Sequence, residues 1–395
     1  MKKLLFLPFF LLLAGCWDTN QPERMYYLYG IGIDFEDDEY VMYAQIIDFT
    51  NIAKSDQPNP EASQAEVGVA RGRTFDEVFF NLYKSMDERL FLGQLEYVIF
   101  SEEAVKQNKG KAIVNSFIRY RELRYTTWTY ITDAPLEEVM LTTPIINKAI
   151  TLSKVADPTN SLKQSSLIQP INFREILINI DEPSHSAIIP FIEISEDWST
   201  DKGPDTVYSI ESVVLVNSQD AYKGHLKGDD VRGLQWMTKK TVRSEITVKM
   251  DGFADPYVTN VVQSIKPTIR PIINEDSIHF ELDVKCVVEG VESENQEIME
   301  KLIKKIEETM EKEIETTYKA ALKMDVDVFR LSETVYRKHN KAWKKMNEDA
   351  GKILEDLQIP CKPDQQLSSC SIAVQQMVAI ARAVDMECKV LILDE

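Results

Sequence analysis

Apolar and polar residues alternate in the first half of the chain with the period of β-strands, and short segments with the period of helices interrupt them. Residues 25–34 and 40–48 are two β-prone runs joined by the acidic segment 35–39, which predicts a hairpin. Thr74 precedes an acidic turn and an apolar stripe that reaches residue 86, which predicts a capped helix. Shorter runs predict strands at 97–100 and 125–132 and helices that begin at Ser101 and Lys111, and this mixture of strands and helices continues through 188–194.

The second half contains the clearest strand and the clearest helix of the sequence. At 278–287 one face is polar, and the other consists of Ile278, Phe280, Leu282, Val284 and Cys286. An apolar sheet face needs a cover, and the helical pattern at 295–323 predicts one, with the apolar stripe Met299, Ile303, Ile306, Met310 and Ile314. We expect this helix to pack on the neighbouring sheet; a partner-binding coiled coil is the alternative.

Weaker patterns complete the second half. Four Glu–Lys pairs spaced i,i+4 follow the outer side of the helix at 295–323, and each contributes about 0.2–0.5 kcal/mol, so apolar burial decides the packing. The remaining predicted elements are strands at 208–216, 242–250 and 257–266, the last ended by Pro267, a helix capped by Asp229 or Asp230 that reaches residue 237, and a helix at 331–355.

One acidic segment interrupts these patterns and divides the chain. Residues 197–205 contain Gly203 and Pro204 and are the predicted domain boundary. We therefore expect a multi-domain α+β protein in which helices cover mixed or antiparallel sheets, with three lobes. The N-terminal α+β region is placed at 25–200 and the C-terminal α+β domain at 206–357.

The net charge of the chain limits the classes of molecule that it can bind. Its 64 acidic and 45 basic residues leave a net charge of −19 over 395 residues. Such a chain repels phosphates, so we expect no binding to DNA or RNA. Electrostatic adhesion to anionic lipid is also disfavoured, and any attachment to a membrane must be hydrophobic or covalent.

The first sixteen residues predict such an attachment. Lys2 and Lys3 precede an apolar run at 4–13, which is too short to span a bilayer and is typical of an export signal. Leu13-Ala14-Gly15-Cys16 resembles the bacterial lipobox, which implies cleavage before Cys16 and a diacylglyceryl group on its thiol. Residues 1–15 are then a signal peptide and 16–24 a lipidated tether; an ordinary secretion signal is the alternative. Two acyl chains give stable anchoring, at about 0.8 kcal/mol per buried CH₂.

No pattern of residues predicts catalysis or a metal site. The four histidines, His185, His225, His279 and His339, have no zinc-ligand spacing, and each is expected on the surface. Asp325 and Asp327 form a possible carboxylate pair, but a solvated edge or a helix cap explains them better. We expect no enzyme activity, no metal and no cofactor. Cys286 is expected to be a small core residue.

Several segments in order resemble one family. Cys16-Trp17-Asp18 and then Gly30-Ile31-Gly32-Ile33-Asp34 resemble the start of the Ger(x)C family, the C-subunit lipoproteins of spore germinant receptors. Further matching segments are 93–96, 119–124, 189–190, 211–226, 232–234, 325–329, 336–338 and Trp343. The usage of Lys and Arg around Arg119 matches the family only loosely.

The resemblance implies a non-enzymatic part of a nutrient receptor. Such lipoproteins act on the outer face of the spore inner membrane, beside two integral-membrane subunits of the A and B types. The alternative function that we weigh is a lipid-anchored solute-binding protein of a transporter, although no internal repeat indicates two similar lobes.

The last part of the chain resembles a different family. Residues 367–376, 379–383 and 389–395 are similar to the signature segment and the Walker B strand of sugar-importer ABC ATPases, with Asp394 and Glu395 in the acidic positions. The chain contains no GxxxxGK[ST] loop, so the fragment cannot hydrolyse ATP alone. We interpret 358–395 as a fusion scar at the place where the resemblance implies a closing strand, which predicts a C-terminal sheet that lacks one edge partner.

Overall fold

The computed structural model describes residues 24–47, 64–119, 123–182, 185–217, 221–250, 256–274, 277–290, 295–344 and short segments between 354 and 378. The chain divides into two compact units, each described here by itself. Unit 1 holds the described residues up to Ser161 together with Pro170–Leu177 and Ile189–Val214; unit 2 holds Leu162–Gln169, Ile178–Ile188 and the described residues from Leu215 on. The α+β class with mixed and antiparallel sheets is confirmed. The fold divides into two units, whereas the sequence analysis expected three lobes.

The elements follow one another along the chain in both units. The strands are β1 (Met25–Glu36), β2 (Glu39–Ile47), β3 (Ala65–Gly72), β4 (Arg89–Phe91), β5 (Tyr97–Ser101), β6 (Trp128–Thr132), β7 (Ser186–Thr200), β8 (Gly203–Asn217), β9 (Tyr222–Leu226), β10 (Ser244–Lys249), β11 (Tyr257–Ile273) and β12 (Ile278–Glu289). The helices are α3 (Phe75–Tyr83), α4 (Glu102–Lys106), α5 (Gly110–Arg119), α6 (Leu136–Leu141), α7 (Thr159–Gln164), α8 (Phe173–Asp181), α9 (Gln296–Lys323) and α10 (Leu331–Lys338).

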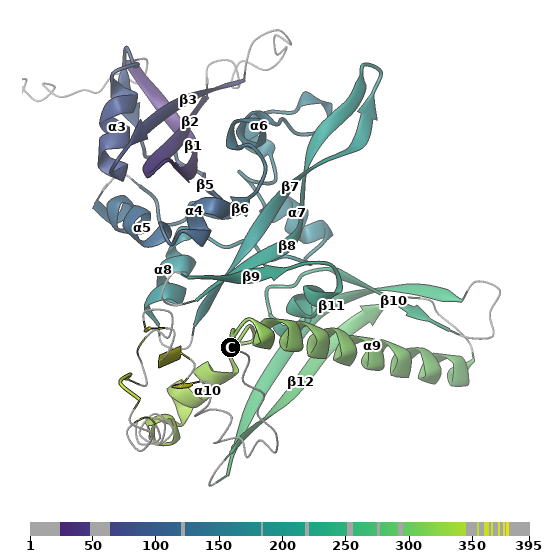
Figure 1. Ribbon diagram of the computed structural model, residues 1–395. Helices are drawn as coiled ribbons and strands as arrows, with labels where there is room; N and C mark the ends of the chain where they lie inside the picture. Colours follow the sequence, from purple (N-terminus) through teal and green to yellow (C-terminus); the bar gives the residue numbers. More distant parts are fainter. Residues whose placement is uncertain are drawn as a thin grey trace, which may run out of the picture. The chain divides into compact units, whose positions relative to one another are not determined.

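The large sheet of unit 1 is mixed. Its strands lie in the order β3-β2-β1-β5-β6-β7-β8 (Figure 1). The short strand β4 pairs with β1. The pairs β1–β2 and β2–β3 are antiparallel, whereas β1–β5, β5–β6 and β6–β7 are parallel. The predicted hairpin is confirmed: Asp37 and Asp38 turn the chain between β1 and β2 with φ values of 50° and 64°. Two successive left-handed residues give a turn whose twist matches that of the strands.

The helix predicted after Thr74 is also confirmed. The Thr74 hydroxyl accepts a hydrogen bond from the Glu77 backbone N–H at 3.1 Å, which satisfies one of the free donors at the start of α3. Phe75, Val78, Phe79 and Leu82 are buried, so α3 covers one face of the β1–β3 meander with its apolar stripe.

The expected interruption at 197–205 is wrong. Residues 186–200 and 203–217 are two long strands, and the acidic residues sit near the tip of the hairpin that joins β7 and β8. The tip is mostly exposed, so charged residues there are as compatible with a strand as with a loop. In unit 2 the far end of β8 pairs with β9.

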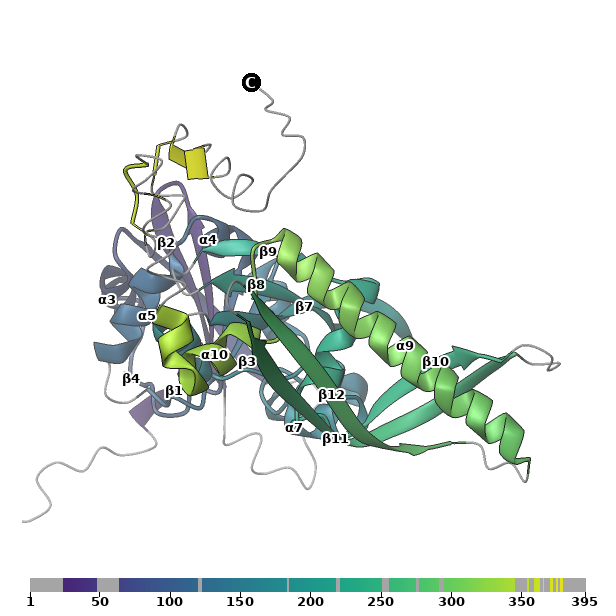
Figure 2. The ribbon, with the colours of Figure 1, turned by 90° about the horizontal axis from the view of Figure 1, so that it is seen from below.

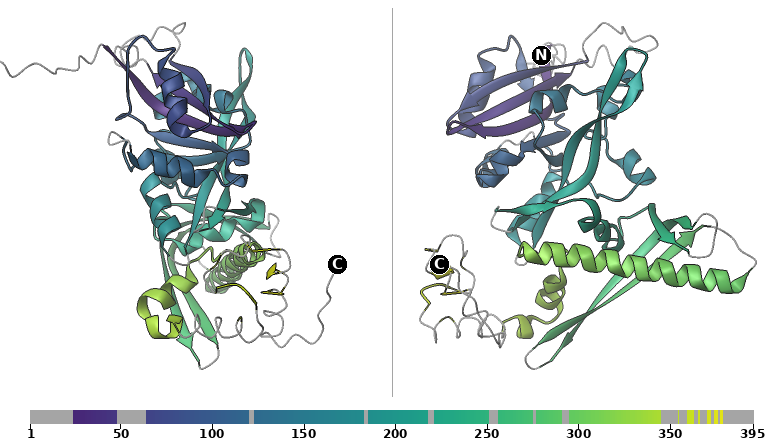
Figure 3. Two further views of the ribbon diagram at one scale, coloured as in Figure 1. Left: turned by 60° about the vertical axis from the view of Figure 1, so that its left-hand side comes forward. Right: turned by 45° about the vertical axis from the view of Figure 1, so that its right-hand side comes forward.

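The second sheet, β10-β11-β12, belongs to unit 2, and α9 lies across one of its faces (Figures 2 and 3). Packing of this helix on the neighbouring sheet is therefore confirmed. The predicted stripe is partly wrong, because Ile303 is 51% exposed and Leu302 is buried in its place. The helix α9 also packs against the short 3-10 helix η6 (Arg232–Met237), which contacts Glu313 and Thr317. Val284 and Cys286 pack against this core as half-buried residues.

Pro267 does not end β11, contrary to the prediction. The Asn274 N–H donates to the Ser277 carbonyl at 2.9 Å, and bonded and non-bonded pairs alternate from there along β11 and β12. Pro267 and Pro271 then occupy non-bonded positions, opposite Val284 and Phe280. Their nitrogens point to the other side of β11, where β10 lies. Since β10 pairs with β11 only as far as Val262, no hydrogen bond is lost at either proline.

The segment 228–237 differs from its prediction as well. Instead of one helix capped by Asp229 or Asp230, it forms two short 3-10 helices, η5 (Gly228–Asp230) and η6, neither of which has a side-chain cap. Two of the four predicted ion pairs of α9 form: Glu297 with Lys301 at 2.7 Å and Glu315 with Lys319 at 2.5 Å. Glu308 pairs with Lys305 at 2.8 Å. Of the helix predicted at 331–355, the part beyond residue 344 lies largely outside the described residues.

Candidate functional site

The predicted lipidation residue, Cys16, lies outside the described residues, as do Trp17 and Asp18 and the segment 379–395 with its Walker B-like strand. In the family segment 119–124, the guanidinium of Arg124 lies 4.0 Å from the Glu96 carboxylate. Partial burial raises the pKa of Glu96, while Arg124 acts in the opposite direction. The other predicted family segments can be placed in the structure.

The Gly30–Asp34 segment forms the middle of β1, where its glycines permit close packing. A Cβ atom on Gly30 would lie 2.3 Å from Cζ of the Tyr97 ring, and one on Gly32 would lie 2.9 Å from Sδ of Met140. Asp34 accepts hydrogen bonds from the Phe35 N–H at 2.8 Å and from the Ser101 hydroxyl. The segment therefore holds β1 tightly against its neighbours: a side chain at Gly30 would overlap the buried Tyr97 ring, and one at Gly32 would require the Met140 side chain to move.

The Tyr97 hydroxyl belongs to a buried polar network inside unit 1. The Tyr97 hydroxyl donates to Gln45 Oε1 at 2.7 Å, and Gln45 Nε2 donates to the Met140 carbonyl. The Tyr208 hydroxyl contacts the carbonyls of Val139 and Thr142 at 2.8 and 2.7 Å. Burial raises the pKa of both Tyr97 and Tyr208, so both phenols stay protonated and act as donors. This network fixes α6 on the sheet.

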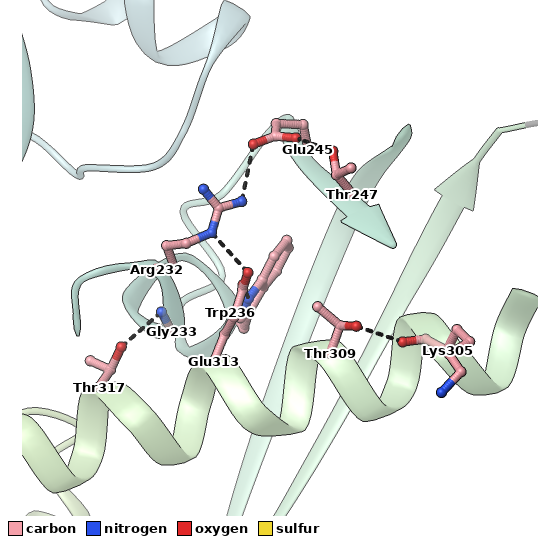
Figure 4. Close-up of polar contacts among 9 residues, drawn as sticks. All are labelled: Arg232, Gly233, Trp236, Glu245, Thr247, Lys305, Thr309, Glu313 and Thr317. Carbon is pink, nitrogen blue, oxygen red and sulfur yellow. Dashed lines mark hydrogen bonds and ion pairs between the residues drawn. The ribbon is translucent and has the colours of Figure 1, made fainter. Parts of the chain in front are cut away.

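The Arg232-Gly233-Leu234 segment forms the corresponding cluster of unit 2, drawn in Figure 4. Arg232 donates through Nε to Glu313 Oε1 at 2.8 Å and through Nη2 to Glu245 Oε1 at 3.0 Å. The buried indole of Trp236 donates to the other Glu313 oxygen at 2.6 Å. Partial burial lowers the pKa of Arg232, but its hydrogen bonds to the two glutamates outweigh this and raise it.

Gly233 brings the backbone of η6 directly onto α9. Its N–H donates to Thr317 Oγ1 at 2.9 Å, and a Cβ there would lie 2.5 Å from the Glu313 carbonyl oxygen. We call Arg232, Gly233, Trp236, Glu245, Glu313 and Thr317 the helix lock. Sequence reasoning singled out Arg232 and Gly233 but missed the rest. The missed signal is Glu313, a charge among the buried positions Met310 and Thr317 of α9, which needs a partner.

Asp325 and Asp327 do not form a carboxylate pair for catalysis, and the helix-cap interpretation is confirmed for Asp327. Its carboxylate accepts hydrogen bonds from the N–H groups of Leu331 and Ser332 at 2.9 and 2.7 Å, at the start of α10. Asp325 has a left-handed backbone with φ 57°, and its side chain is 3.6 Å from Lys223.

The surface position expected for His185 is wrong. His185 is 3% exposed, and its Nε2 lies 3.0 Å from Glu333 Oε2 in α10. Burial lowers the pKa of His185, although Glu333 opposes this. Arg330 donates to Asn179 Oδ1 at 2.9 Å. Within unit 2, these two contacts tie segment 178–188 to the start of α10 and the turn before it.

The chemistry available to the described residues is limited. No group of three His, Cys, Asp or Glu side chains in the described part of the chain could hold a metal ion. The helices described are each too short or too polar to cross a bilayer. Cys286, which was expected in the core, is half-buried and packs against the core of unit 2, and burial raises the pKa of its thiol. The segments singled out in the sequence thus serve packing, capping and hydrogen bonding.

Comparison with known proteins matches both halves of the chain. The family model for the spore germination protein N-terminal domain matches residues 18–194. The model described as spore germination B3/GerAC like, C-terminal, matches residues 211–368. Together the two models cover most of the chain.

Individual relatives are similar over comparable lengths. Spore germination protein KC of Bacillus subtilis (strain 168) is 23% identical over 379 residues, which are 90% of this chain and 91% of that protein. Spore germination protein B3 of the same organism is 21% identical over 354 residues, 86% and 90% of the two chains. The crystal structure of the GerBC protein covers 81% of this chain and 90% of that one, with 16% identity and a TM-score of 0.49.

A short match concerns a protein of another kind. Over 54 residues, 13% of this chain, the sequence is 54% identical to the fructose import ATP-binding protein FruK of Bifidobacterium longum (strain NCC 2705). The match covers 10% of that protein, which agrees with the resemblance of the tail to a fragment of an ABC ATPase.

Proposed function

This chain belongs to the spore germination protein family, and we propose that it is a membrane-anchored lipoprotein subunit of a nutrient germinant receptor. In this proposal it acts by protein–protein interaction rather than by catalysis. Its partners are integral-membrane receptor subunits of the A and B types, and it resides on the outer face of the spore inner membrane, held by a lipid on Cys16.

The observation that supports this proposal best is the structural role of the segments that resemble the family. Gly30, Asp34, Arg232, Gly233 and Asp327 each contact backbone or core, and none of them belongs to a group arranged around a reacting atom. Segments that hold elements in place preserve the shape of a surface, which is what a subunit that works by contact requires. The surface itself is acidic overall, since the chain carries a net charge of −19.

A covalent lipid is the physical means of attachment that fits this surface. An acidic body is repelled by anionic headgroups, so electrostatic adhesion is too weak to hold it on the membrane. A diacylglyceryl group on Cys16 would supply two acyl chains, and at about 0.8 kcal/mol per buried CH₂ these outweigh the repulsion. No nucleic acid and no cofactor is needed in this role.

The experiment follows the lipid and the membrane association together. Cells that produce the chain are grown with a labelled fatty acid, and the wild type is compared with Cys16→Ala and with Cys286→Ala as the matched cysteine control. We expect label and membrane association in the wild type and in Cys286→Ala, and the loss of both in Cys16→Ala. A labelled Cys16→Ala variant, or an unlabelled wild type in the water-soluble fraction, would refute the anchoring.

The role in the receptor is tested by germination. Spores in which the gene carries Cys16→Ala should respond more slowly to the nutrient of that receptor, and an unchanged response to an unrelated nutrient is the control. An unaltered response to every nutrient would count against a receptor subunit. Purified chain that hydrolyses ATP would count against the non-catalytic role.

A further inference from the structure

The second sheet of unit 2 ends in a strand whose outer edge is open in the described part of the chain. The strand order is β10-β11-β12, so β12 pairs with β11 on one side and with no described strand on the other. Beyond Val262, β11 has no pairing with β10, and from Lys266 to Ile273 it forms with β12 a two-stranded arm (Figures 2 and 3). The helix α10 packs against β11, whereas no described strand pairs with the outer edge of β12, so a further strand at that edge would stabilise the arm.

The backbone groups that this edge offers follow from the hairpin register. Asn274 and Ser277 form a hydrogen-bonded pair, and the alternation along the antiparallel ladder then points the N–H and C=O groups of Ile278, Phe280, Leu282 and Val284 outward. Pro267 and Pro271 support this assignment, since both stand at pairs that need no donor. The open edge is therefore a continuous row of donors and acceptors.

Two of the features that usually protect edge strands, a proline and a break in the pairing, are missing from the described edge between Ile278 and Lys285. β12 contains no proline and has no break in its pairing from Ile278 to Lys285. Its polar face carries charges of both signs, and Glu281 is already compensated by Arg270 at 3.6 Å. No ion pair joins Asp283 or Lys285 to another described residue. A long, regular edge with two uncompensated opposite charges is a template for pairing.

We propose that β12 is a dimerisation edge: two copies of this chain pair antiparallel along β12, about a two-fold axis at Val284. In a symmetric pair of β12 strands, residues whose N–H and C=O groups point to the open edge must lie opposite residues of the same kind. Such residues alternate along the strand, so the two-fold axis has to pass through a residue position rather than between two residues. Four such centres, from Leu282 to Lys285, keep most of the strand paired.

Charge selects one of these four registers. An axis at Leu282 places Glu281 opposite Asp283 twice. An axis at Asp283 places Glu281 opposite Lys285 twice but also places Asp283 opposite itself, and an axis at Lys285 places Lys285 opposite itself. An axis at Val284 places Asp283 opposite Lys285 twice, with no pair of like charges.

The remaining pairs of this register are also compatible. His279 meets Glu289, and Glu281, which already pairs with Arg270, meets Val287. On the other face Leu282 meets Cys286 and Phe280 meets Val288, which extends the apolar side of the arm across the axis. Leu282, Val287 and Val288 are 38%, 54% and 38% exposed in the single chain, so the pairing has apolar surface to bury.

Because β12 is complementary in charge to a second copy of itself, we expect β12 of a second copy as the partner rather than a strand of another protein. The proposal goes beyond the receptor role and does not depend on it, because it concerns an edge of unit 2 alone. Coverage of the same edge by another protein or by the chain's own tail is an outcome that the test distinguishes.

The test uses the full-length chain in detergent, with sedimentation velocity over a concentration series. We expect a reversible dimer in the wild type. Asp283→Lys and Lys285→Asp each turn two attractive pairs into two repulsive ones, and each should weaken the dimer about tenfold. A mixture of the two variants should form a heterodimer with wild-type affinity, since every pair is then again between opposite charges.

The control is Glu297→Lys with Lys301→Glu, an exposed ion pair of α9 whose exchange leaves the net charge unchanged and should leave the dimer unaffected. Lys285 is exposed, so Lys285→Asp is expected to fold and tests the proposal even if Asp283→Lys does not. A wild type that is monomeric at all concentrations, as it would be if the tail or another protein covered β12, would overturn the proposal. So would a dimer that both charge changes leave intact.

Discussion

Unit 1 and unit 2 hold their sheets in different ways. In unit 1, the strand β1 is paired on both sides, its residues 28–33 are buried, and polar groups such as Tyr97 and Gln45 satisfy one another inside the core. In unit 2, one long helix covers a three-stranded sheet whose last strand is largely exposed, and the helix lock supplies the specific contacts. Unit 1 should therefore tolerate little change in the volume of its buried side chains, whereas the stability of unit 2 depends on a few polar contacts.

The largest effect is expected at Gly30 in unit 1. In Gly30→Val the new side chain would overlap the Tyr97 ring, whose Cζ is 2.3 Å from the position of a Cβ atom. We expect the free energy of unfolding of unit 1 to fall by about 3 kcal/mol, as measured by chemical denaturation followed by tyrosine fluorescence. Gly68→Ala is the matched control, because a Cβ there meets only Leu82 Cδ1 at 3.4 Å. Equal stability of the two variants would contradict the close packing of β1.

The next effect is expected in the helix lock. Glu313→Gln keeps the shape of the side chain but places an amide donor opposite the donors of Arg232 and Trp236. Since Trp236 is buried, we expect a loss of about 2 kcal/mol in the stability of unit 2, followed by tryptophan fluorescence. Glu315→Gln, in an exposed pair with Lys319, should cost less than about 0.5 kcal/mol. A comparable loss in both would show that the lock has no special role.

A smaller effect is expected at the start of α10. Asp327→Ala removes the acceptor for the N–H groups of Leu331 and Ser332 and should cost about 1 kcal/mol. Asp325→Asn is the control, since asparagine tolerates the left-handed backbone at that position. Hydrogen exchange of the amides of residues 331 and 332 should accelerate in the first variant and not in the second. Unchanged exchange in Asp327→Ala would contradict the cap.

The smallest effect concerns the pH dependence of unit 2. Burial lowers the pKa of His185 below its ordinary value of 6.5; Glu333 and Glu182 oppose this, and Arg330 and Arg337 reinforce it. Below about pH 6.5 the unfolded chain therefore binds a proton more readily than the folded one, and stability falls as the pH decreases. Above that pH the contribution is complete. His185→Gln should flatten this part of the stability profile, and identical slopes in wild type and His185→Gln would contradict the assignment.

Regular elements were predictable from the sequence, and their long-range partners were not. The hairpin of β1 and β2, the Thr74 cap, β12 and α9 follow from local patterns of apolar and turn residues. Ile303 was misassigned because Leu302 and Ile303 are both apolar neighbours of the stripe, and the periodicity alone does not show that Leu302 lies in the core with Ile306 and Met310. Pro267 was misread because a single strand does not show which of its nitrogens need a partner.

In the candidate site, too, individual residues were predictable from the sequence and their partners were not. Gly30, Arg232 and Gly233 stood out as family segments, but their reasons are the Tyr97 ring, the Glu313 carboxylate and the Thr317 hydroxyl, which lie 67, 81 and 84 residues away in sequence. His185 was placed on the surface because histidine alone gives no sign of burial; its partner Glu333 lies in another part of the chain.

The most direct test of the proposed function is affinity purification of the chain from detergent extracts of spore inner membrane, with mass spectrometry of the proteins that accompany it. The account predicts that integral-membrane receptor subunits of the A and B types accompany the wild type and are depleted with Cys16→Ala. Recovery of the wild-type chain from the water-soluble fraction, without either subunit, would contradict it.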